Sequence, residues 1–183
     1  MIVLPVRNIG FHIIEKLIDQ LQLQFFLVSL IVGEKLPETV EKMAKLGIMG
    51  IPFPVEYGGA GGDNVLYSMA VEELSRVCAT TGVIVSAHTS LCASPIYEFG
   101  NEEQHGRYIP RVAAGETMSM DLTEPDAGSD LQSVMLKATY SEKDECWYLN
   151  GVKRFITNGD ADIHLVLARS EDGTRDGRGL SMF

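Results

Sequence analysis

The spacing of apolar residues changes near Gly115 and divides this 183-residue sequence into two unlike halves. Before Gly115, apolar residues recur every three or four positions, which is the period of a helix with one buried face. After it, β-branched and aromatic residues alternate with polar ones, which is typical of strands. We therefore predict an α+β fold, with an N-terminal all-helical domain over residues 1–116 and an antiparallel β domain over residues 117–183.

Local signals mark where several helices of the first half begin and end. Pro37 predicts a helix start because proline fits the first helical turn, and Gly47 predicts the end of that helix. Asn101 and Gln104 have the spacing of a capping box, which predicts another helix start. Between these helices, residues 48–62 are rich in proline and glycine and predict an irregular loop.

The stretch from Leu21 to Val32 is almost entirely apolar. A membrane-spanning helix needs about 20 apolar residues, and this run is shorter and is interrupted by glutamine and serine. Glu15 and Asp19 precede it, which is not typical of a secretory signal. We expect a helix over residues 11–32 that is buried or covered by a partner, and no membrane span.

The charge of the chain limits its partners. The sequence has 25 Asp and Glu against 15 Lys and Arg, a formal net charge of -10, and no basic cluster. Phosphate binding needs clustered Lys and Arg, so we expect neither nucleic acid nor an anionic membrane as a partner. Cys78, Cys92 and Cys146 are widely separated and lack metal-ligand spacing, which favours free thiols in a reducing compartment over a zinc site.

The segment Met118–Asp130 is the strongest candidate for a ligand-binding loop. It begins with the alternation of a half-buried strand and continues as Thr-Glu-Pro-Asp-Ala-Gly-Ser-Asp, a run of turn formers. Such a segment ends a strand and presents hydroxyls and backbone amides to a neighbouring ligand. On composition alone the alternative is an ordinary acidic turn, in which Thr123 or Asp126 caps a short helical turn.

The spacing within this loop excludes two other kinds of site. A calcium loop that began at Asp121 would need glycine at its sixth position, which is Asp126. A serine nucleophile elbow would need glycine two residues before and two residues after Ser129, and those positions hold Ala127 and Leu131. The loop therefore predicts neither a calcium site nor a hydrolase.

His88 lies on a small, apolar helical face with Ile84, Ala87 and Leu91. No carboxylate lies one turn away to orient its imidazole. We therefore interpret His88 as a hydrogen-bonded core or rim histidine and not as a catalytic base.

Two features describe the strands of the second half. Asn150-Gly151 stands between two apolar runs and predicts a two-residue hairpin turn. The sequence stops in the apolar run Gly179–Phe183, where a sheet would have an unpaired edge. We therefore expect that more polypeptide normally follows and that the chain is a fragment.

Four separated segments occur together in the order and spacing of one enzyme family. They are Gly47–Gly61, Pro95–Gln104 with its continuation to Tyr108-Ile-Pro110 and Gly115-Glu116, Leu122–Asp130 and Gly151–Gly159. With these segments the chain resembles the N-terminal helical domain and the middle β-domain of acyl-CoA dehydrogenases. The resemblance covers roughly Leu36 to the end. The apolar stretch before Gly33 departs from it, because it lacks the charged, amphipathic first helix usual in the family.

The resemblance implies FAD as the cofactor, because in similar proteins the loop after the first middle-domain strand holds the flavin. Leu122 and Thr123 would hydrogen-bond the pyrimidine side of the flavin, and Met120 would lie beside the ring system. Gly128 and Ser129 would lie against the phosphate arm of FAD and the pantetheine of the thioester substrate.

The resemblance also implies roles for a second segment and for the helical half. Phe155, which replaces an aromatic residue that is often Trp, would pack on the flavin, with Ile156 beside it. Thr157 would donate a hydrogen bond toward the hydride-accepting edge. Simple strand packing is the alternative for Phe155 and Thr157. Substrate-binding residues would be Ser129, Ile84, Ala87 and Leu91. The hydroxyls of Thr123, Ser129 and Thr157 would then converge on one crevice.

The implied reaction is FAD-dependent α,β-dehydrogenation of an acyl-CoA thioester. In relatives the catalytic Glu lies in a C-terminal helical bundle, and nothing in this sequence matches its context. We therefore assign no catalytic residue, and we expect a chain that is truncated before that bundle and inactive alone. Glu124 belongs to the flavin-loop motif and is not assigned as the base.

The implied partners are an acyl-CoA substrate, an electron-transfer flavoprotein or similar acceptor, and further copies of the full-length protein. The implied location is the cytoplasm, or the mitochondrial matrix in a eukaryote. One alternative is a flavin-dependent acyl-CoA oxidase of the same fold. The other is a noncatalytic truncated homologue that acts as an interaction module through its apolar N-terminal helix and open strand edge.

Overall fold

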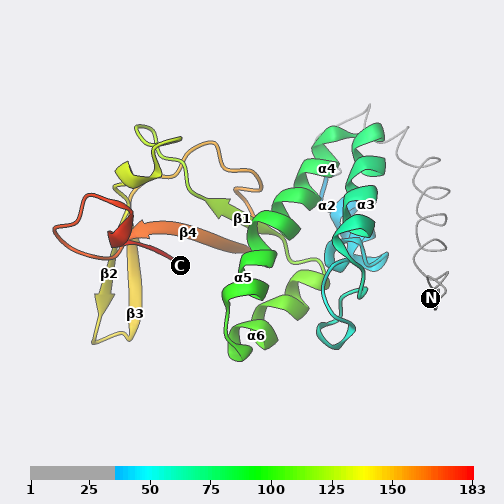
Figure 1. Ribbon diagram of the computed structural model, residues 1–183, viewed down its shortest axis with the longest axis horizontal. Coiled ribbons are helices and arrows are strands. Elements are labelled where there is room, and N and C mark those ends of the chain that lie inside the picture. The colour runs from blue at the N-terminus through cyan, green and yellow to red at the C-terminus, as the bar shows by residue number, and fades with distance from the viewer. Residues whose placement is uncertain (1–35) are drawn as a thin grey trace, which may run out of the picture. The chain divides into compact units, whose positions relative to one another are not determined.

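The computed structural model describes residues 36–183 (Figure 1), so the helix expected over residues 11–32 lies outside the described residues. The chain separates into two compact units, and the division falls between Glu116 and Thr117. We call residues 36–116 the helical unit and residues 117–183 the β unit. Within residues 36–183, no helix is both long enough and apolar enough to cross a membrane.

The helical unit is built from five α-helices, one π-helical segment and short 3-10 turns. The α-helices are α2 (Leu36–Lys45), α3 (Asn64–Val77), α4 (Ala79–Ser86), α5 (Ser94–Phe99) and α6 (Glu102–Ala113), and the π-helical segment is Ala87–Ala93. One core cluster joins the second half of α2, the following loop, α3 and α4, and consists of Met43, Ile48, Met49, Ile51, Ala70, Leu74 and Val85.

The capping signals of the helical unit are confirmed. The Gln104 amide donates to the Asn101 side chain at 2.9 Å and the Asn101 amide donates to the Gln104 side chain at 2.9 Å, which completes the capping box of α6. Gly47 follows α2 with φ +76°, a left-handed conformation that glycine adopts without strain. These contacts explain why the helix boundaries could be predicted from local sequence.

The β unit contains a five-stranded sheet. Its strands are β1 (Met118–Asp121), β2 (Lys137–Ser141), β3 (Cys146–Asn150), β4 (Ile163–Arg169) and β5 (Leu180–Met182). Their order is β1-β4-β2-β3, and β5 also pairs with β4. Its core cluster consists of Leu136, Ala138 and Ala168, with Val166 and Phe183 packed against it.

The predicted order of a helical part followed by a β part is confirmed, but the sheet is mixed and not wholly antiparallel. β1 and β4 are parallel, with Met118 opposite Ile163, while β2–β3 and β4–β5 are antiparallel. The long connection between β1 and β4 contains the whole β2–β3 hairpin, so β4 can return alongside β1 in the same direction. Strand alternation alone carries no information about this direction.

The hairpin predicted at Asn150-Gly151 is wrong. The β2–β3 turn lies at residues 142–145, where Glu145 adopts φ +52°. Gly151 instead follows β3 at a close approach, because a Cβ there would lie 2.8 Å from the Cα of Leu136. The glycine is therefore needed for packing and not for the turn.

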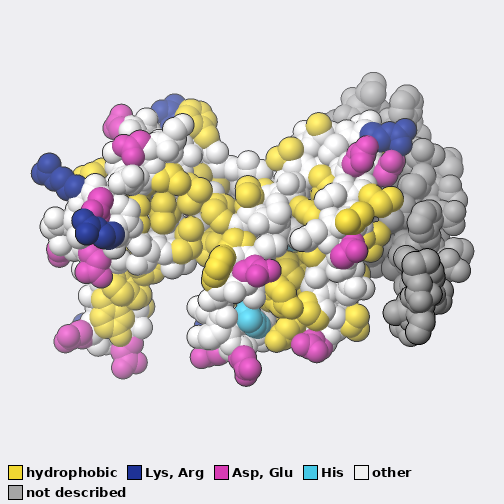
Figure 2. All heavy atoms as spheres, viewed as in Figure 1, with side chains coloured by type: hydrophobic (Ala, Val, Ile, Leu, Met, Phe, Trp, Pro, Cys, Tyr) yellow, Lys and Arg dark blue, Asp and Glu magenta, His cyan; other side chains and the backbone are white. Residues whose placement is uncertain are grey.

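The β2–β3 hairpin carries aromatic side chains that are partly exposed (Figure 2). The rings of Tyr140 and Trp147 are 5.3 Å apart, and the rings of Trp147 and Phe183 are 5.1 Å apart. Tyr140 and Trp147 are opposite each other on β2 and β3, and this ring pair stabilises a hairpin whose strand β3 is exposed along its length.

Candidate functional site

The Thr-Glu-Pro-Asp-Ala-Gly-Ser-Asp loop begins with a tight turn immediately after β1. The Glu124 amide donates to the Ala127 carbonyl at 2.8 Å, and the Ala127 amide donates back to the Glu124 carbonyl at 3.4 Å. The nearby helical turn is Leu131–Ser133, which begins after Asp130. Neither Thr123 nor Asp126 therefore caps it, so the capping role given to them in the ordinary-turn alternative is wrong.

A buried ion pair holds this turn in place. Lys153 Nζ lies 2.9 Å from Glu124 Oε1 and 2.9 Å from the Leu122 carbonyl, and the two side chains are 7% and 8% exposed. Glu124 also accepts hydrogen bonds from the amides of Met135, at 2.8 Å, and Leu136, at 2.9 Å. Burial acts to raise the pKa of Glu124, but these hydrogen bonds outweigh it and hold the pKa below its usual value.

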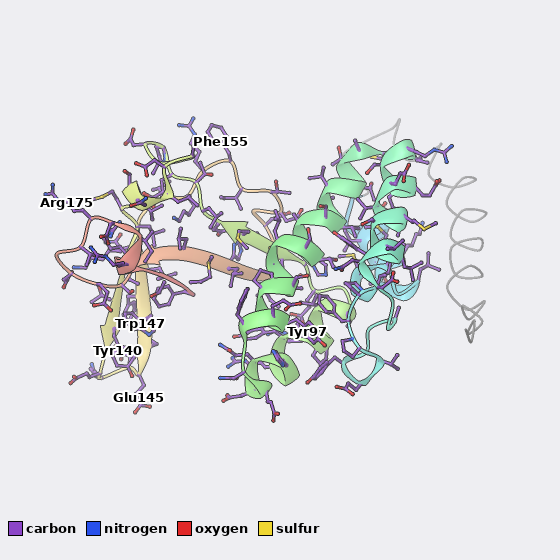
Figure 3. All side chains as sticks on the ribbon, in the orientation of Figure 1. Tyr97, Tyr140, Glu145, Trp147, Phe155 and Arg175 are labelled. Atoms are coloured by element: carbon purple, nitrogen blue, oxygen red, sulfur yellow. The ribbon has the colours of Figure 1, made fainter. Side chains whose placement is uncertain are left out.

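The segment that follows Lys153 lies beside the same loop. The Arg154 amide donates to the Thr123 carbonyl at 2.8 Å. Phe155 has φ +59°, and its side chain is 81% exposed at the end of the β unit opposite the hairpin tip (Figure 3). The Arg154 guanidinium lies 4.9 Å from the centre of the Phe155 ring. An exposed aromatic ring in this strained conformation is not explained by strand packing, which was the alternative for Phe155.

The structure brings together some of the predicted cofactor residues. Gly128 lies next to Thr123, because a Cβ at Gly128 would be 3.9 Å from Thr123 Cγ2 and would meet no nearer atom. The hydroxyls of Thr123, Ser129 and Thr157 donate no hydrogen bond to any other described residue, so all three are available to a ligand. No hydrogen bond within residues 36–183 joins Ser129 or Thr157 to Thr123, and their convergence on one crevice stays a prediction.

The remaining predicted cofactor residues are Met120, Leu122 and Ile156, and all three are half-buried. Met120 lies in β1 opposite Leu165 of β4, which fixes its position in the sheet. Leu122 is fixed through its carbonyl, which accepts the hydrogen bond from Lys153. Their contacts with a flavin also stay predictions.

The predicted substrate residues of the helical unit do not all share one face. Ile84 and Ala87 are buried, whereas Leu91 is 52% exposed. The physical reason is that Ala87–Ala93 is π-helical, so a turn contains more residues than the α-helical spacing assumes. π-Segments often occur at functional sites, but the role of these three residues in substrate binding stays a prediction.

His88 is fully buried in the π-helical segment, as the interpretation of a core histidine requires. It is not hydrogen-bonded as expected, because neither ring nitrogen makes a well-aligned hydrogen bond to a described residue. Burial lowers the pKa of His88 to about 4, although the carbonyls of Met49 and Val112 act weakly in the opposite direction. His88 is therefore neutral at pH 7.

The depressed pKa of His88 predicts a loss of stability in mild acid. The unfolded chain binds this proton near pH 6.5 and the folded chain only near pH 4, so the free energy of unfolding should fall by about 3 kcal/mol across that window. Urea unfolding of the helical unit, followed by far-UV circular dichroism at pH 7 and pH 4, measures this loss. His88→Leu should abolish most of this slope, whereas the matched variant His164→Gln in the β unit should keep it. An unchanged slope in His88→Leu would contradict the assignment.

A polar cluster that was not predicted from the sequence joins β1 and β4. Ser119 Oγ lies 2.7 Å from Asp121 Oδ1 and 2.7 Å from His164 Nδ1, and Asp121 Oδ2 lies 2.9 Å from the same nitrogen. Both partners use Nδ1, and Ser119 is fully buried, so the cluster cannot relay a proton as a hydrolase triad does. It fastens β1 to β4. Ser119 and Asp121 lie two residues apart and therefore on the same face of β1. Their partner His164 could be identified only from the pairing of β1 with β4.

The structure thus places a helical unit before a mixed β unit and fixes the turn after β1 by a segment that follows β3. Two family models match the chain: the acyl-CoA dehydrogenase N-terminal domain over residues 32–116 and the acyl-CoA dehydrogenase middle domain over residues 119–183. The chain belongs to the acyl-CoA dehydrogenase family, which confirms the resemblance stated above.

Individual relatives agree with this assignment. The short-chain-specific acyl-CoA dehydrogenase of Clostridium acetobutylicum is 49% identical over 152 residues, which are 82% of this chain and 40% of the relative. The solved butyryl-CoA dehydrogenase of Megasphaera elsdenii has a TM-score of 0.85 and 33% identity, over 100% of this chain and 49% of that one. A Bacillus anthracis acyl-CoA dehydrogenase complexed with FAD has a TM-score of 0.83 and 28% identity, over 98% of this chain and 31% of that one. The chain thus spans less than half the length of each.

Proposed function

We propose that this chain is the flavin-contacting part of an acyl-CoA dehydrogenase that carries out FAD-dependent α,β-dehydrogenation of an acyl-CoA thioester. FAD, when bound, supplies the acceptor for the hydride that leaves the β-carbon. The single observation that carries the proposal is the fixed but unpartnered state of Thr123. Its backbone is held by Arg154, yet its hydroxyl donates to no described residue.

The residues of the two loops fit a flavin by their chemistry. Leu122 and Thr123 would meet the pyrimidine side, with Met120 beside the ring. Phe155, Ile156 and Thr157 would approach from the second loop, where the exposed Phe155 ring offers a flat apolar surface. Gly128 and Ser129 would contact the phosphate arm and the pantetheine, because a residue without a side chain lets both come close to the backbone.

Glu124 is unsuited to remove the α-proton of the substrate. Its carboxylate already accepts from Lys153, Met135 and Leu136, and its pKa is lowered, so it is a weak base that is not free to move. The proposed work of this chain is therefore to bind and orient the cofactor and the thioester. Because two of the relatives above are named for short-chain and butyryl substrates, we extend the proposal to short acyl thioesters, with Ile84, Ala87 and Leu91 beside the acyl chain.

The proposal is tested by titrating the purified chain with FAD and following the loss of flavin fluorescence. We expect saturable binding, and we expect Thr123→Val to weaken it about fivefold, the cost of one lost hydrogen bond. Thr139→Val, at an exposed threonine of β2, is the matched control and should bind like the wild type. A folded chain that binds no FAD, or equal affinity in Thr123→Val, would overturn the proposal.

Adding butyryl-CoA to the flavin-loaded chain separates cofactor binding from turnover. We expect the flavin absorbance to persist, because the buried Glu124 carboxylate is fully engaged and is not free to remove the α-proton. Partners in the proposal are an electron-transfer flavoprotein as acceptor and further copies of the full-length protein. The proposed location is the cytoplasm or the mitochondrial matrix. Peroxide formation by the full-length protein would instead favour the acyl-CoA oxidase alternative.

A further inference from the structure

Lys153 has a contact that a purely structural ion pair does not need. Its ammonium group is nearly buried, and a buried charge costs several kcal/mol unless it is paired and hydrogen-bonded. Glu124 supplies the opposite charge, but the second partner, at 2.9 Å, is the backbone carbonyl of Leu122. The Leu122 carbonyl and the Thr123 N–H belong to the same peptide group. Thr123 is at the centre of the proposed flavin site.

The Glu124 carboxylate would still accept two hydrogen bonds without its contact to Lys153. It accepts from the Met135 and Leu136 amides, and the two bonds fasten the loop to the segment before β2. The carboxylate thus explains how the loop is anchored, and the lysine is left with a separate role at the Leu122 carbonyl.

We propose that Lys153 is a positioning residue for the flavin, acting through the Leu122 carbonyl to fix and polarise the peptide group between Leu122 and Thr123. This inference rests on the proposed function. A charge-assisted hydrogen bond at a carbonyl oxygen draws electron density from the peptide, which makes the N–H of the same peptide a stronger donor. Lys153 therefore strengthens the donor at Thr123 without touching the cofactor.

The polarised peptide has a consequence for the electron affinity of the bound flavin. Two-electron reduction adds negative charge to the pyrimidine side of the ring system, which Leu122 and Thr123 are proposed to meet. A fixed donor aimed at developing charge stabilises it more than it stabilises the uncharged ring. Lys153 should therefore raise the affinity for reduced flavin more than for oxidised flavin, and so make the reduction potential more positive.

The test compares variants that separate charge from anchoring. Lys153→Met removes the ammonium and keeps most of the stem, Glu124→Gln removes the opposite charge and keeps the lysine, and Lys143→Met, in the exposed hairpin turn, is the control of equal net charge. Each chain is titrated with FAD and with riboflavin, and the reduction potential of the bound flavin is measured against a reference dye.

We expect Lys153→Met to weaken FAD and riboflavin binding about tenfold and to move the potential to a more negative value. Glu124→Gln should leave the potential unchanged or more positive, because the lysine is then less neutralised. Lys143→Met should match the wild type. If Lys153→Met is poorly folded, Glu124→Gln with Lys153→Met leaves no buried unpaired charge and should show the same negative shift.

The outcomes distinguish this inference from the proposed function. If the wild-type chain is folded and binds neither FAD nor riboflavin, the proposed function fails. If the wild type binds both but the potential in Lys153→Met equals that in Lys143→Met, the inference fails and Lys153 is structural only. Equal shifts in Lys153→Met and Glu124→Gln would also overturn it, because anchoring alone would then explain the effect.

Discussion

Glu124→Ala should lower the free energy of unfolding of the β unit by about 3–5 kcal/mol, the usual cost of removing one partner of a buried ion pair. The substitution leaves the Lys153 ammonium with a single carbonyl partner in the core and removes the acceptor of the Met135 and Leu136 amides. Urea unfolding at pH 7, followed by the fluorescence of Trp147, measures the loss.

A double-mutant cycle shows whether the pair is responsible. Glu124→Ala combined with Lys153→Met should cost less than the sum of the two single substitutions, because the double variant buries no unpaired charge. Glu142→Ala, at an exposed position of the hairpin turn, is the control and should change the free energy of unfolding by less than about 0.5 kcal/mol. Costs that simply add, or a loss below about 1 kcal/mol in Glu124→Ala, would show that the two charges do not depend on each other.

Features of the fold that depend on neighbouring residues could be predicted from the sequence. The capping box at Asn101 and Gln104 closes within one helical turn, and the left-handed glycine at Gly47 needs only its own backbone. The helical and β halves follow from periodicity for the same reason. The hairpin prediction failed because Asn150-Gly151 has the right local chemistry, while the close packing of Gly151 on Leu136 is a tertiary constraint.

The candidate site divides in the same way. The turn after β1 could be located because strand alternation gives way to turn formers at Thr123. Its anchor could not, because Glu124 and Lys153 are 29 residues apart and meet only when the loop and the segment after β3 lie together. Ser119 and His164 are likewise joined by the parallel β1–β4 pairing, which no local pattern specifies. The family resemblance implies ligand roles for the residues of these loops. The Glu124–Lys153 ion pair and the hydrogen bonds around it explain physically how the loops are fixed in place.

Gly59→Ala should destabilise the helical unit by more than about 3 kcal/mol, at the upper end of the cost of overpacking a core. A Cβ at this position would lie 2.1 Å from the carbonyl oxygen of Phe53 and 2.8 Å from that of Gly50, both backbone atoms. The first carbonyl accepts from the Gly61 amide at 2.9 Å, and the second accepts from the Ala60 amide at 3.0 Å, so neither can retreat without breaking a turn of the loop.

Gly106→Ala is the matched substitution, because a Cβ at this exposed position of α6 would meet nothing within 4 Å. It should stabilise the helical unit by about 0.5–1 kcal/mol, since alanine loses less backbone entropy in a helix than glycine does. Urea unfolding of both variants, followed by far-UV circular dichroism, should therefore give changes of opposite sign from the same chemical substitution. A small change in Gly59→Ala would mean that the loop over residues 48–62 can shift to admit a methyl group, and the close packing of its backbone would not be what fixes it.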